Sequence, residues 1–244
     1  MNYTLLPLIR EKKQYQACLA LWNVEGKSIS SQDLNWLHPK EKDIYDNYSS
    51  ELRRHSYLLG RLSSKLAVSQ LCQTPNPKDF WIDMGIFNFP VVRAIEFQNI
   101  QVSISHSGSI GFSIAFPEAH PMGVDVERVD AKNQEAVLSQ LTAKEIKQFS
   151  KLEWENDVTY TALFSIKEAL SKILRTGMML DFKFLEIDDC RKEAGDSYEC
   201  SYKNFPQYKA YAFRQSQYIF SFALPKNTKI STEKIRELFS NCFE

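Results

Sequence analysis

The stretch Gly123-Val124-Asp125-Val126-Glu127 combines apolar and acidic residues in the alternation of a half-buried strand. In a strand, residues i and i+2 point to the same face. We therefore expect Asp125 and Glu127 to project together from one face, while Val124 and Val126 point into the core. The stretch predicts a strand that carries two carboxylates on a single face.

A second stretch, Phe164-Ser165-Ile166-Lys167-Glu168-Ala169-Leu170-Ser171-Lys172, lies within a predicted helix over residues 158–175. Residues four apart are neighbours on a helix surface, so we expect Glu168 and Lys172 to lie side by side. Taken singly, the first stretch is more often a solvated strand end and the second a surface ion pair. Together they predict three carboxylates and a lysine around one site.

The ligand type predicts which metal such a site would hold. Oxygen ligands without a nearby histidine or cysteine favour Mg²⁺ over zinc or copper. We therefore expect Asp125, Glu127 and Glu168 to bind Mg²⁺. Because Mg²⁺ fills its remaining positions with water and substrate phosphates, the set predicts chemistry on a phosphate ester.

A third segment, Val102-Ser103-Ile104-Ser105-His106-Ser107-Gly108, alternates like a strand and then runs into a turn. A second predicted strand, residues 112–116, follows it. Ser105, His106 and the backbone N–H groups near Gly108 are candidates for holding a phosphate. A histidine at a strand end is more often a structural hydrogen-bonding residue, so this segment alone is a weak indication.

The order S-x-S-H-S-G, G-V-D-V-E and F-S-I-K-E-A-x-x-K resembles the 4′-phosphopantetheinyl transferases of the surfactin-synthetase-activating (Sfp) type. The resemblance extends over residues 37–225. It implies Mg²⁺-dependent transfer of 4′-phosphopantetheine from coenzyme A to a serine of an apo acyl or peptidyl carrier protein, with release of adenosine 3′,5′-bisphosphate. Such modification serves fatty acid, polyketide or nonribosomal peptide biosynthesis, and the sequence does not identify the carrier.

The resemblance also implies roles for the residues at matching positions. Glu168 and Lys172 are expected to be catalytic, with Glu168 or a metal-bound water as the base. Arg61, in a segment that resembles the family's G-R-x-x-x-K helix, is the candidate for the 3′-phosphate of coenzyme A. The full set expected to bind coenzyme A is Arg61, Lys65, Ser105, His106, Asp125, Lys167 and Lys172.

The sequence departs from the family ahead of the S-H motif, where many relatives carry a G-K-P segment. The nearest stretch here, residues 85–90, reads Gly-Ile-Phe-Asn-Phe-Pro and lacks the lysine. Arg93 is a candidate to supply the missing charge.

Composition is that of a globular enzyme. The 244 residues include 30 basic and 30 acidic side chains, so bulk attraction to nucleic acid or to a membrane surface is not indicated. No apolar run approaches the roughly 20 residues that span a bilayer, and the N-terminus lacks a signal-peptide pattern. The five cysteines are odd in number and form no C-x-x-C, which predicts reduced thiols and a cytoplasmic location.

Short echoes along the chain predict an internal repeat. Residues 37–41 echo 141–145, residues 64–66 echo 171–173, and residues 112–117 echo 220–225, at offsets of 104, 107 and 108. We therefore expect an α+β fold that is a pseudo-dimer of two similar halves, each with a helical segment packed on a small antiparallel sheet. Residues 1–118 would supply the coenzyme A phosphate contacts and residues 119–244 the metal and transfer motifs.

The resemblance implies the same pseudo-dimer, with the site between the halves. Because one chain would supply both halves of the site, we expect a monomer.

Hydrophobic periodicity and turn signals give the coarse elements. Predicted helices cover residues 51–72, 158–175 and a short segment from Ser231, and Thr142-x-x-Glu145 predicts a capping box. Predicted strands are residues 3–9, 17–24, 80–84, 180–187, 197–202, 208–214 and 218–224.

Two other classes of function stay open. One is a non-catalytic homologue that binds carrier proteins but has lost the transfer activity. The other is a Mg²⁺-dependent phosphoesterase that acts on a free nucleotide and needs no carrier protein.

Overall fold

The structure, a computed structural model, describes residues 2–26, 29–86, 89–94 and 99–243. It divides into two compact units: unit 1 is Met1–Pro121 with Thr228–Glu244, and unit 2 is Met122–Asn227. The boundary predicted after residue 118 lies close to this division. Residues 228–244, which we expected in the C-terminal half, pack with unit 1 instead. Among the described residues, no helix has the length and apolar character needed to cross a membrane.

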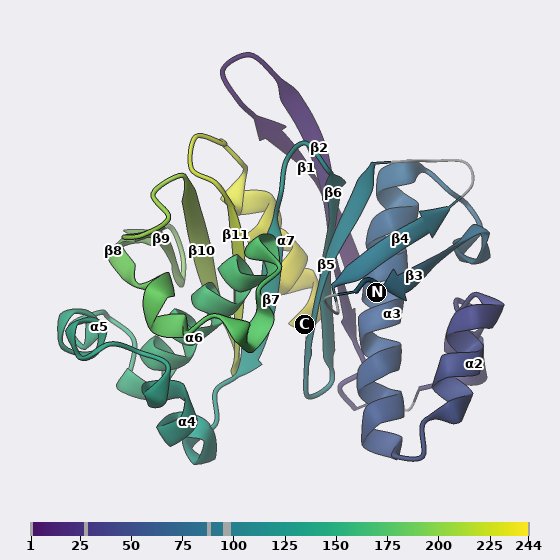
Figure 1. The fold of residues 1–244 in the computed structure, drawn as a ribbon, viewed down its shortest axis with the longest axis horizontal. Coiled ribbons are helices and arrows are strands. Elements are labelled where there is room, and N and C mark those ends of the chain that lie inside the picture. The colour runs from purple at the N-terminus through teal and green to yellow at the C-terminus, as the bar shows by residue number, and fades with distance from the viewer. Residues whose placement is uncertain (1, 27–28, 87–88, 95–98, 244) are drawn as a thin grey trace. The chain divides into compact units, whose positions relative to one another are not determined.

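Unit 1 is built on an antiparallel sheet with the strand order β1-β2-β6-β5 (Figure 1). Its strands are β1 (Asn2–Ile9), β2 (Gln14–Asn23), β5 (Ile100–Ser107) and β6 (Ile110–Pro117). A separate hairpin pairs β3 (Phe80–Met84) with β4 (Pro90–Ala94). The helices are α1 (Ser31–Leu34), α2 (Pro39–Asn47), α3 (Glu51–Cys72) and α7 (Thr232–Phe243), with a 3₁₀ turn η1 (Pro77–Asp79).

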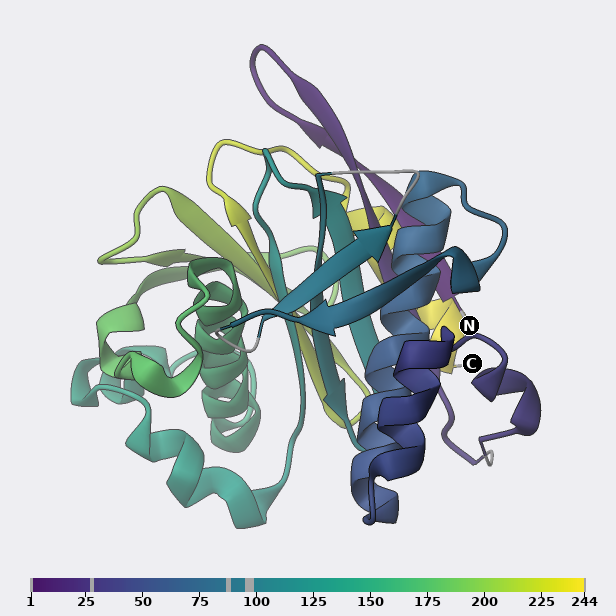
Figure 2. The same cartoon turned by 45° about the vertical axis from the view of Figure 1, so that its right-hand side comes forward.

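Two helices cover opposite faces of the unit 1 sheet. On β6, Ser113 bonds to Ser63 of α3, whereas the neighbouring Phe112 contacts Phe239 of α7. Because successive strand residues point to opposite faces, α3 and α7 lie on different sides of the sheet. The short helix α2 lies beside α3 (Figure 2).

Unit 2 is a five-stranded antiparallel sheet in the order β7-β11-β10-β9-β8. Its strands are β7 (Gly123–Arg128), β8 (Ile187–Glu193), β9 (Ser197–Tyr202), β10 (Tyr208–Gln215) and β11 (Tyr218–Pro225). The helices are α4 (Gln134–Ser139), α5 (Ala143–Phe149) and α6 (Asn156–Leu174), with 3₁₀ turns η2 (Ala131–Asn133), η3 (Gly177–Met179) and η4 (Phe182–Leu185).

Helix α6 packs on β7, β11 and β10 (Figure 1). Its approach to β7 is so close that a Cβ on Gly123 would lie 2.0 Å from the carbonyl oxygen of Ala169. Glycine at this position therefore lets the helix backbone rest directly on the strand. The consequence is that side chains of β7 and α6 meet at short range.

The predicted α+β class is confirmed, since helices pack on sheets whose strand pairs are antiparallel. The helix predicted over 51–72 and the strands over 80–84 and 197–202 have these bounds in the structure. The strand predicted over 180–187 is wrong. Asp181 accepts a hydrogen bond from the N–H of Lys183 and starts the 3₁₀ turn η4, so β8 begins only at Ile187.

The prediction of reduced thiols is wrong for two of the five cysteines. Cys190 and Cys200 form a disulfide between β8 and β9, where the antiparallel register places them directly opposite each other. Their ten-residue separation belongs to no short cysteine motif, so only the strand pairing brings them together. Cys18, Cys72 and Cys242 are not part of a disulfide.

Candidate functional site

The acidic residues expected to bind metal lie in unit 2, on β7 and α6. Asp125 is only 3% exposed, and its Oδ1 lies 2.8 Å from the Nζ of Lys172. The same Nζ donates to the backbone carbonyl of Val124 at 2.8 Å. Lys172 is thus tied to β7 by two contacts, and its side chain remains 25% exposed.

The second oxygen of Asp125 has a buried partner that the sequence did not reveal. Ser165 donates from Oγ to Asp125 Oδ2 at 2.8 Å. The Ser165 hydroxyl also lies 2.6 Å from the Oγ of Ser221 on β11. Both serines are fully buried.

Electrostatics shows that the three carboxylates and Lys172 belong to one cluster. Burial and the negative charges of Asp125 and Glu168 together raise the pKa of Glu127 to about 8, against the lowering effect of Lys172. Burial and the Asp125 charge likewise raise the pKa of Glu168, against the lowering effect of Lys172. Desolvation and like-charge repulsion both favour the protonated acids, so a nearby positive charge would stabilise the ionised forms.

The donor set of this cluster fits Mg²⁺. All its candidate ligands are carboxylate oxygens, and Mg²⁺ usually takes a few carboxylates together with water and phosphate oxygens. Among the residues that the structure describes, no three histidine, cysteine, aspartate or glutamate side chains are grouped closely enough to enclose a metal ion. Carboxylate donors of this kind suit an Mg²⁺ ion whose remaining ligands are water and phosphate oxygens.

In unit 1 two of the residues expected to bind coenzyme A, Arg61 and His106, border a cavity of about 660 Å³. Helices α2 and α3, the β3–β4 hairpin and β5 contribute to its wall. The lining is mostly apolar, and its cationic members are the guanidinium groups of Arg53 and Arg61. Its residues are Ile44, Tyr48, Leu52, Arg53, Ser56, Tyr57, Gly60, Arg61, Met84, Pro90, Ile104 and His106.

Arg61 is held in this cavity by its neighbours. Its guanidinium carbon lies 4.5 Å from the centre of the Tyr57 ring, and its Nε lies 3.7 Å from Glu41 Oε1. The side chain is 8% exposed, and its Nε has no hydrogen-bond partner within the described part of the chain. A fixed, buried arginine with unused donor capacity is suited to binding an anion such as phosphate.

His106 and Ser105 do not act as a pair. His106 is exposed and borders the cavity, together with Ile104. Ser105 is buried and lies between them on β5, so its side chain points to the opposite face of the strand. The expectation that both side chains hold one phosphate is therefore not supported, and His106 is the one placed to do so.

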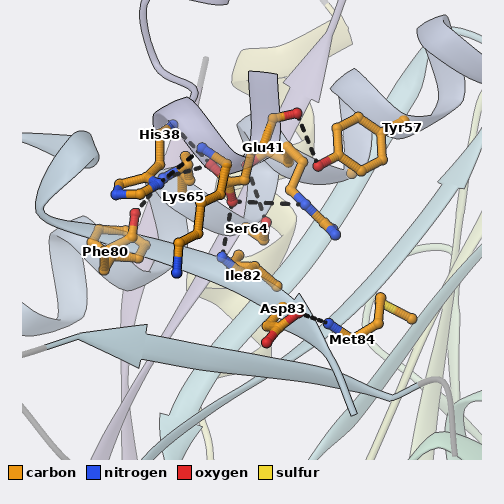
Figure 3. Close-up of polar contacts among 12 residues, drawn as sticks. His38, Glu41, Tyr57, Ser64, Lys65, Phe80, Ile82, Asp83 and Met84 are labelled. Carbon is orange, nitrogen blue, oxygen red and sulfur yellow. Dashed lines mark hydrogen bonds and ion pairs between the residues drawn. The ribbon is translucent and has the colours of Figure 1, made fainter. Parts of the chain in front are cut away.

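Lys65 does not border the cavity. It is fully buried, and its Nζ lies 2.9 Å from Glu41 Oε2 and donates to the carbonyl oxygens of Pro77 and Phe80 (Figure 3). Glu41 in turn accepts hydrogen bonds from the backbone N–H groups of His38 and Ile82. These contacts give Lys65 a structural role and argue against its expected contact with coenzyme A.

Lys167 has the same arrangement in unit 2. It is fully buried, its Nζ lies 2.8 Å from Glu145 Oε2, and it donates to the carbonyl of Gln140. Glu145 also accepts from the N–H groups of Thr142 and Ile187, and it completes the predicted capping box. These contacts therefore give Lys167 a structural role and argue against its expected contact with coenzyme A.

Lys65 and Lys167, which are 102 residues apart, make the same kind of buried contact, whereas the sequence echo had aligned Lys65 with Lys172.

The remaining candidate, Arg93, pairs with Asp83 across the β3–β4 hairpin, with Nε and Oδ2 3.6 Å apart. Both side chains are about half exposed. Residues 87 and 88 of the segment without the G-K-P lysine lie outside the described residues.

Residues 121–223 match the family model of the 4′-phosphopantetheinyl transferase superfamily. The match covers less than half of the chain and lies almost entirely in unit 2. It includes all four members of the charged cluster: Asp125, Glu127, Glu168 and Lys172. No curated protein matches the chain.

Proposed function

We propose that this protein transfers the 4′-phosphopantetheine group of coenzyme A to a serine of an apo acyl or peptidyl carrier protein, in a Mg²⁺-dependent reaction of the Sfp type. The single observation that carries the proposal is the charged cluster on β7 and α6 inside the segment that matches the superfamily. Carboxylates arranged around a lysine are suited to a divalent ion and a pyrophosphate.

We assign the pyrophosphate of coenzyme A to this cluster and the 3′-phosphate to the cavity of unit 1. Asp125, Glu127 and Glu168 would hold Mg²⁺, which supplies positive charge to the pyrophosphate oxygens when bound. Arg61 and His106 border a cavity whose apolar walls suit a nucleotide base.

The chemical step is a displacement at phosphorus. The carrier serine Oγ attacks the phosphorus that bears pantetheine, and the bond from that phosphorus to the bridging oxygen breaks. Adenosine 3′,5′-bisphosphate leaves with the bridging oxygen. Glu168 accepts the serine proton, and Lys172 stabilises the negative charge that develops on the leaving phosphate.

We also propose that the two units are similar halves of a pseudo-dimer, and that the protein acts as a monomer. The buried pairs Glu41–Lys65 and Glu145–Lys167 correspond in partners and in burial. Helices α3 and α6 both end in a left-handed residue, Gln73 or Arg175, that follows the matched lysine by eight positions. These correspondences support the proposal that each half is one copy of the same unit.

Intact-protein mass spectrometry tests the function. The purified protein is mixed with coenzyme A, Mg²⁺ and a panel of apo carrier proteins. We expect a carrier to gain the mass of one phosphopantetheine group, and the gain to disappear when Mg²⁺ is chelated. Carrier binding without any mass gain would instead indicate a non-catalytic module, and hydrolysis of coenzyme A without a carrier would indicate a phosphoesterase.

A further inference from the structure

Asp125 is held by a chain of buried hydroxyl groups. Its Oδ2 accepts from Ser165 Oγ at 2.8 Å, and Ser165 Oγ lies 2.6 Å from Ser221 Oγ. A serine hydroxyl has one proton to donate. Since Ser165 donates its proton to Asp125, the bond between the serines must be donated by Ser221. The direction is therefore Ser221 to Ser165 to Asp125.

The three residues come from three elements of unit 2. Ser221 on β11 is the direct cross-strand partner of Asp125 on β7, and Ser165 reaches both from α6. Both serines are fully buried, so no solvent competes for these bonds. The chain therefore fixes one oxygen of Asp125 relative to the sheet and the helix at the same time.

We propose that Ser165 and Ser221 are positioning residues for Asp125. They turn Oδ2 toward the buried hydroxyl groups and leave Oδ1 on the side of the partly exposed Lys172. Partners that orient a ligating carboxylate contribute strongly to metal affinity. This inference rests on the proposed function, because it requires that Asp125 hold the metal.

Unit 1 offers a matched control. Ser63 on α3 and Ser113 on β6 are also fully buried, with their Oγ atoms 2.7 Å apart. Here the hydroxyl of Ser63 lies 3.0 Å from the carbonyl oxygen of Leu59, and no carboxylate is involved. The variant Ser63→Ala thus loses the same kind of buried hydrogen bond without affecting Asp125.

The test compares Mn²⁺ affinity in the full-length wild type, Ser165→Ala, Ser221→Ala and Ser63→Ala. Electron paramagnetic resonance of free Mn²⁺, with coenzyme A present, gives the affinity, and thermal unfolding gives the stability of each variant. We expect Ser165→Ala to weaken Mn²⁺ binding by about tenfold or more. Ser221→Ala should weaken it less, because Ser165 still donates to Asp125. Ser63→Ala should lose stability but keep wild-type affinity.

Each outcome decides one question. If the wild type binds no Mn²⁺, the metal assignment of the proposed function fails, and the positioning role fails with it. If the wild type binds Mn²⁺ and Ser165→Ala binds it equally well, only the positioning role is overturned. Should Ser165→Ala fail to fold, Ser221→Ala decides, and an affinity equal to that of Ser63→Ala overturns the proposal.

Discussion

Replacing Lys167 by methionine should destabilise unit 2 without removing a group from the reaction site. Methionine keeps most of the length of the side chain but lacks the ammonium group. The Glu145 carboxylate, which is fully buried, would lose its charged partner and keep only the N–H groups of Thr142 and Ile187. Removing one partner of a buried ion pair costs about 3–5 kcal/mol.

Lys172→Met should behave in the opposite way. The side chain of Lys172 is 25% exposed, so water can replace part of its interaction with Asp125 and the loss of stability should be smaller. Turnover should be lost, because the proposed function places Lys172 beside the reacting phosphate. The two variants should therefore differ in effect: Lys167→Met mainly lowers the stability of unit 2, and Lys172→Met mainly lowers activity.

Hydrogen exchange followed by mass spectrometry measures the stability of each unit separately. A loss of about 3–5 kcal/mol corresponds to at least about a hundredfold faster exchange in amides protected by global opening of unit 2. In the Lys167→Met variant, peptides that contain Ile187 or residues of α6 should show this faster exchange. Lys65→Met is the matched control in unit 1, where the faster exchange should appear near Ile82.

The double variant Glu145→Gln with Lys167→Met completes this test. Because it removes both charges, it should recover part of the stability lost by Lys167→Met alone. Unchanged exchange in Lys167→Met, combined with weaker binding of coenzyme A, would refute the structural role and restore Lys167 as a ligand-binding residue.

Three further results are expected. Asp125→Asn should lower carrier modification by at least about a hundredfold in initial-rate measurements, because one metal-binding charge is lost; a folded variant with full activity would exclude the metal site. Arg61→Ala should raise the KM for coenzyme A about 10- to 100-fold, since a charge-assisted contact is removed. The same substitution should have little effect on 3′-dephospho-coenzyme A; equal effects on both substrates would remove Arg61 from the 3′-phosphate. Alkylation of the unfolded chain should modify three cysteines without reductant and all five after reduction. In the native protein, burial raises the pKa of Cys18 to about 12, so this thiol should stay protonated and resist alkylation at mildly alkaline pH.

Local patterns predicted those parts of the fold and the site that depend on near neighbours in the chain. The alternation in β7 places Asp125 and Glu127 on one face because strand geometry is set by adjacent residues. The spacing of apolar residues, together with turn signals, likewise predicted the bounds of α3, Glu51–Cys72. The capping box of α5 predicted the contact between Thr142 and Glu145.

Contacts between distant residues could not be predicted in this way. Glu41 on α2 and Lys65 on α3 are 24 residues apart in sequence, with a loop between their helices. Nothing in a G-R-x-x-x-K pattern shows that this lysine is buried. The hydroxyl chain from Ser221 to Asp125 depends on the pairing of β7 with β11, which are far apart in sequence. The alternation of β5 shows that the side chains of Ser105 and His106 point to opposite faces of the strand. Which of these faces borders the cavity depends on the packing of α3, which a local pattern does not show.

In the proposed pseudo-dimer, α3 and α6 share some buried contacts and differ in the side chains assigned to the reaction. At the offset of 102 residues, Ser63 and Lys65 correspond to Ser165 and Lys167, and each pair makes the same kind of buried contact. At the same offset, Leu66 and Gln70 of α3 occupy the positions of Glu168 and Lys172 of α6. Leu163 of α6 occupies the position of Arg61 of α3.

Under the proposed function, this difference between the helices separates the structural lysines, Lys65 and Lys167, from the reactive Lys172. Side chains that satisfy buried backbone groups recur in both units, because each helix must be joined to its sheet in the same way. The arginines that border the cavity lie in unit 1, whereas the acidic cluster lies in unit 2. A lysine such as Lys167 is therefore assigned by its buried partner, even though it lies next to Glu168 in the motif.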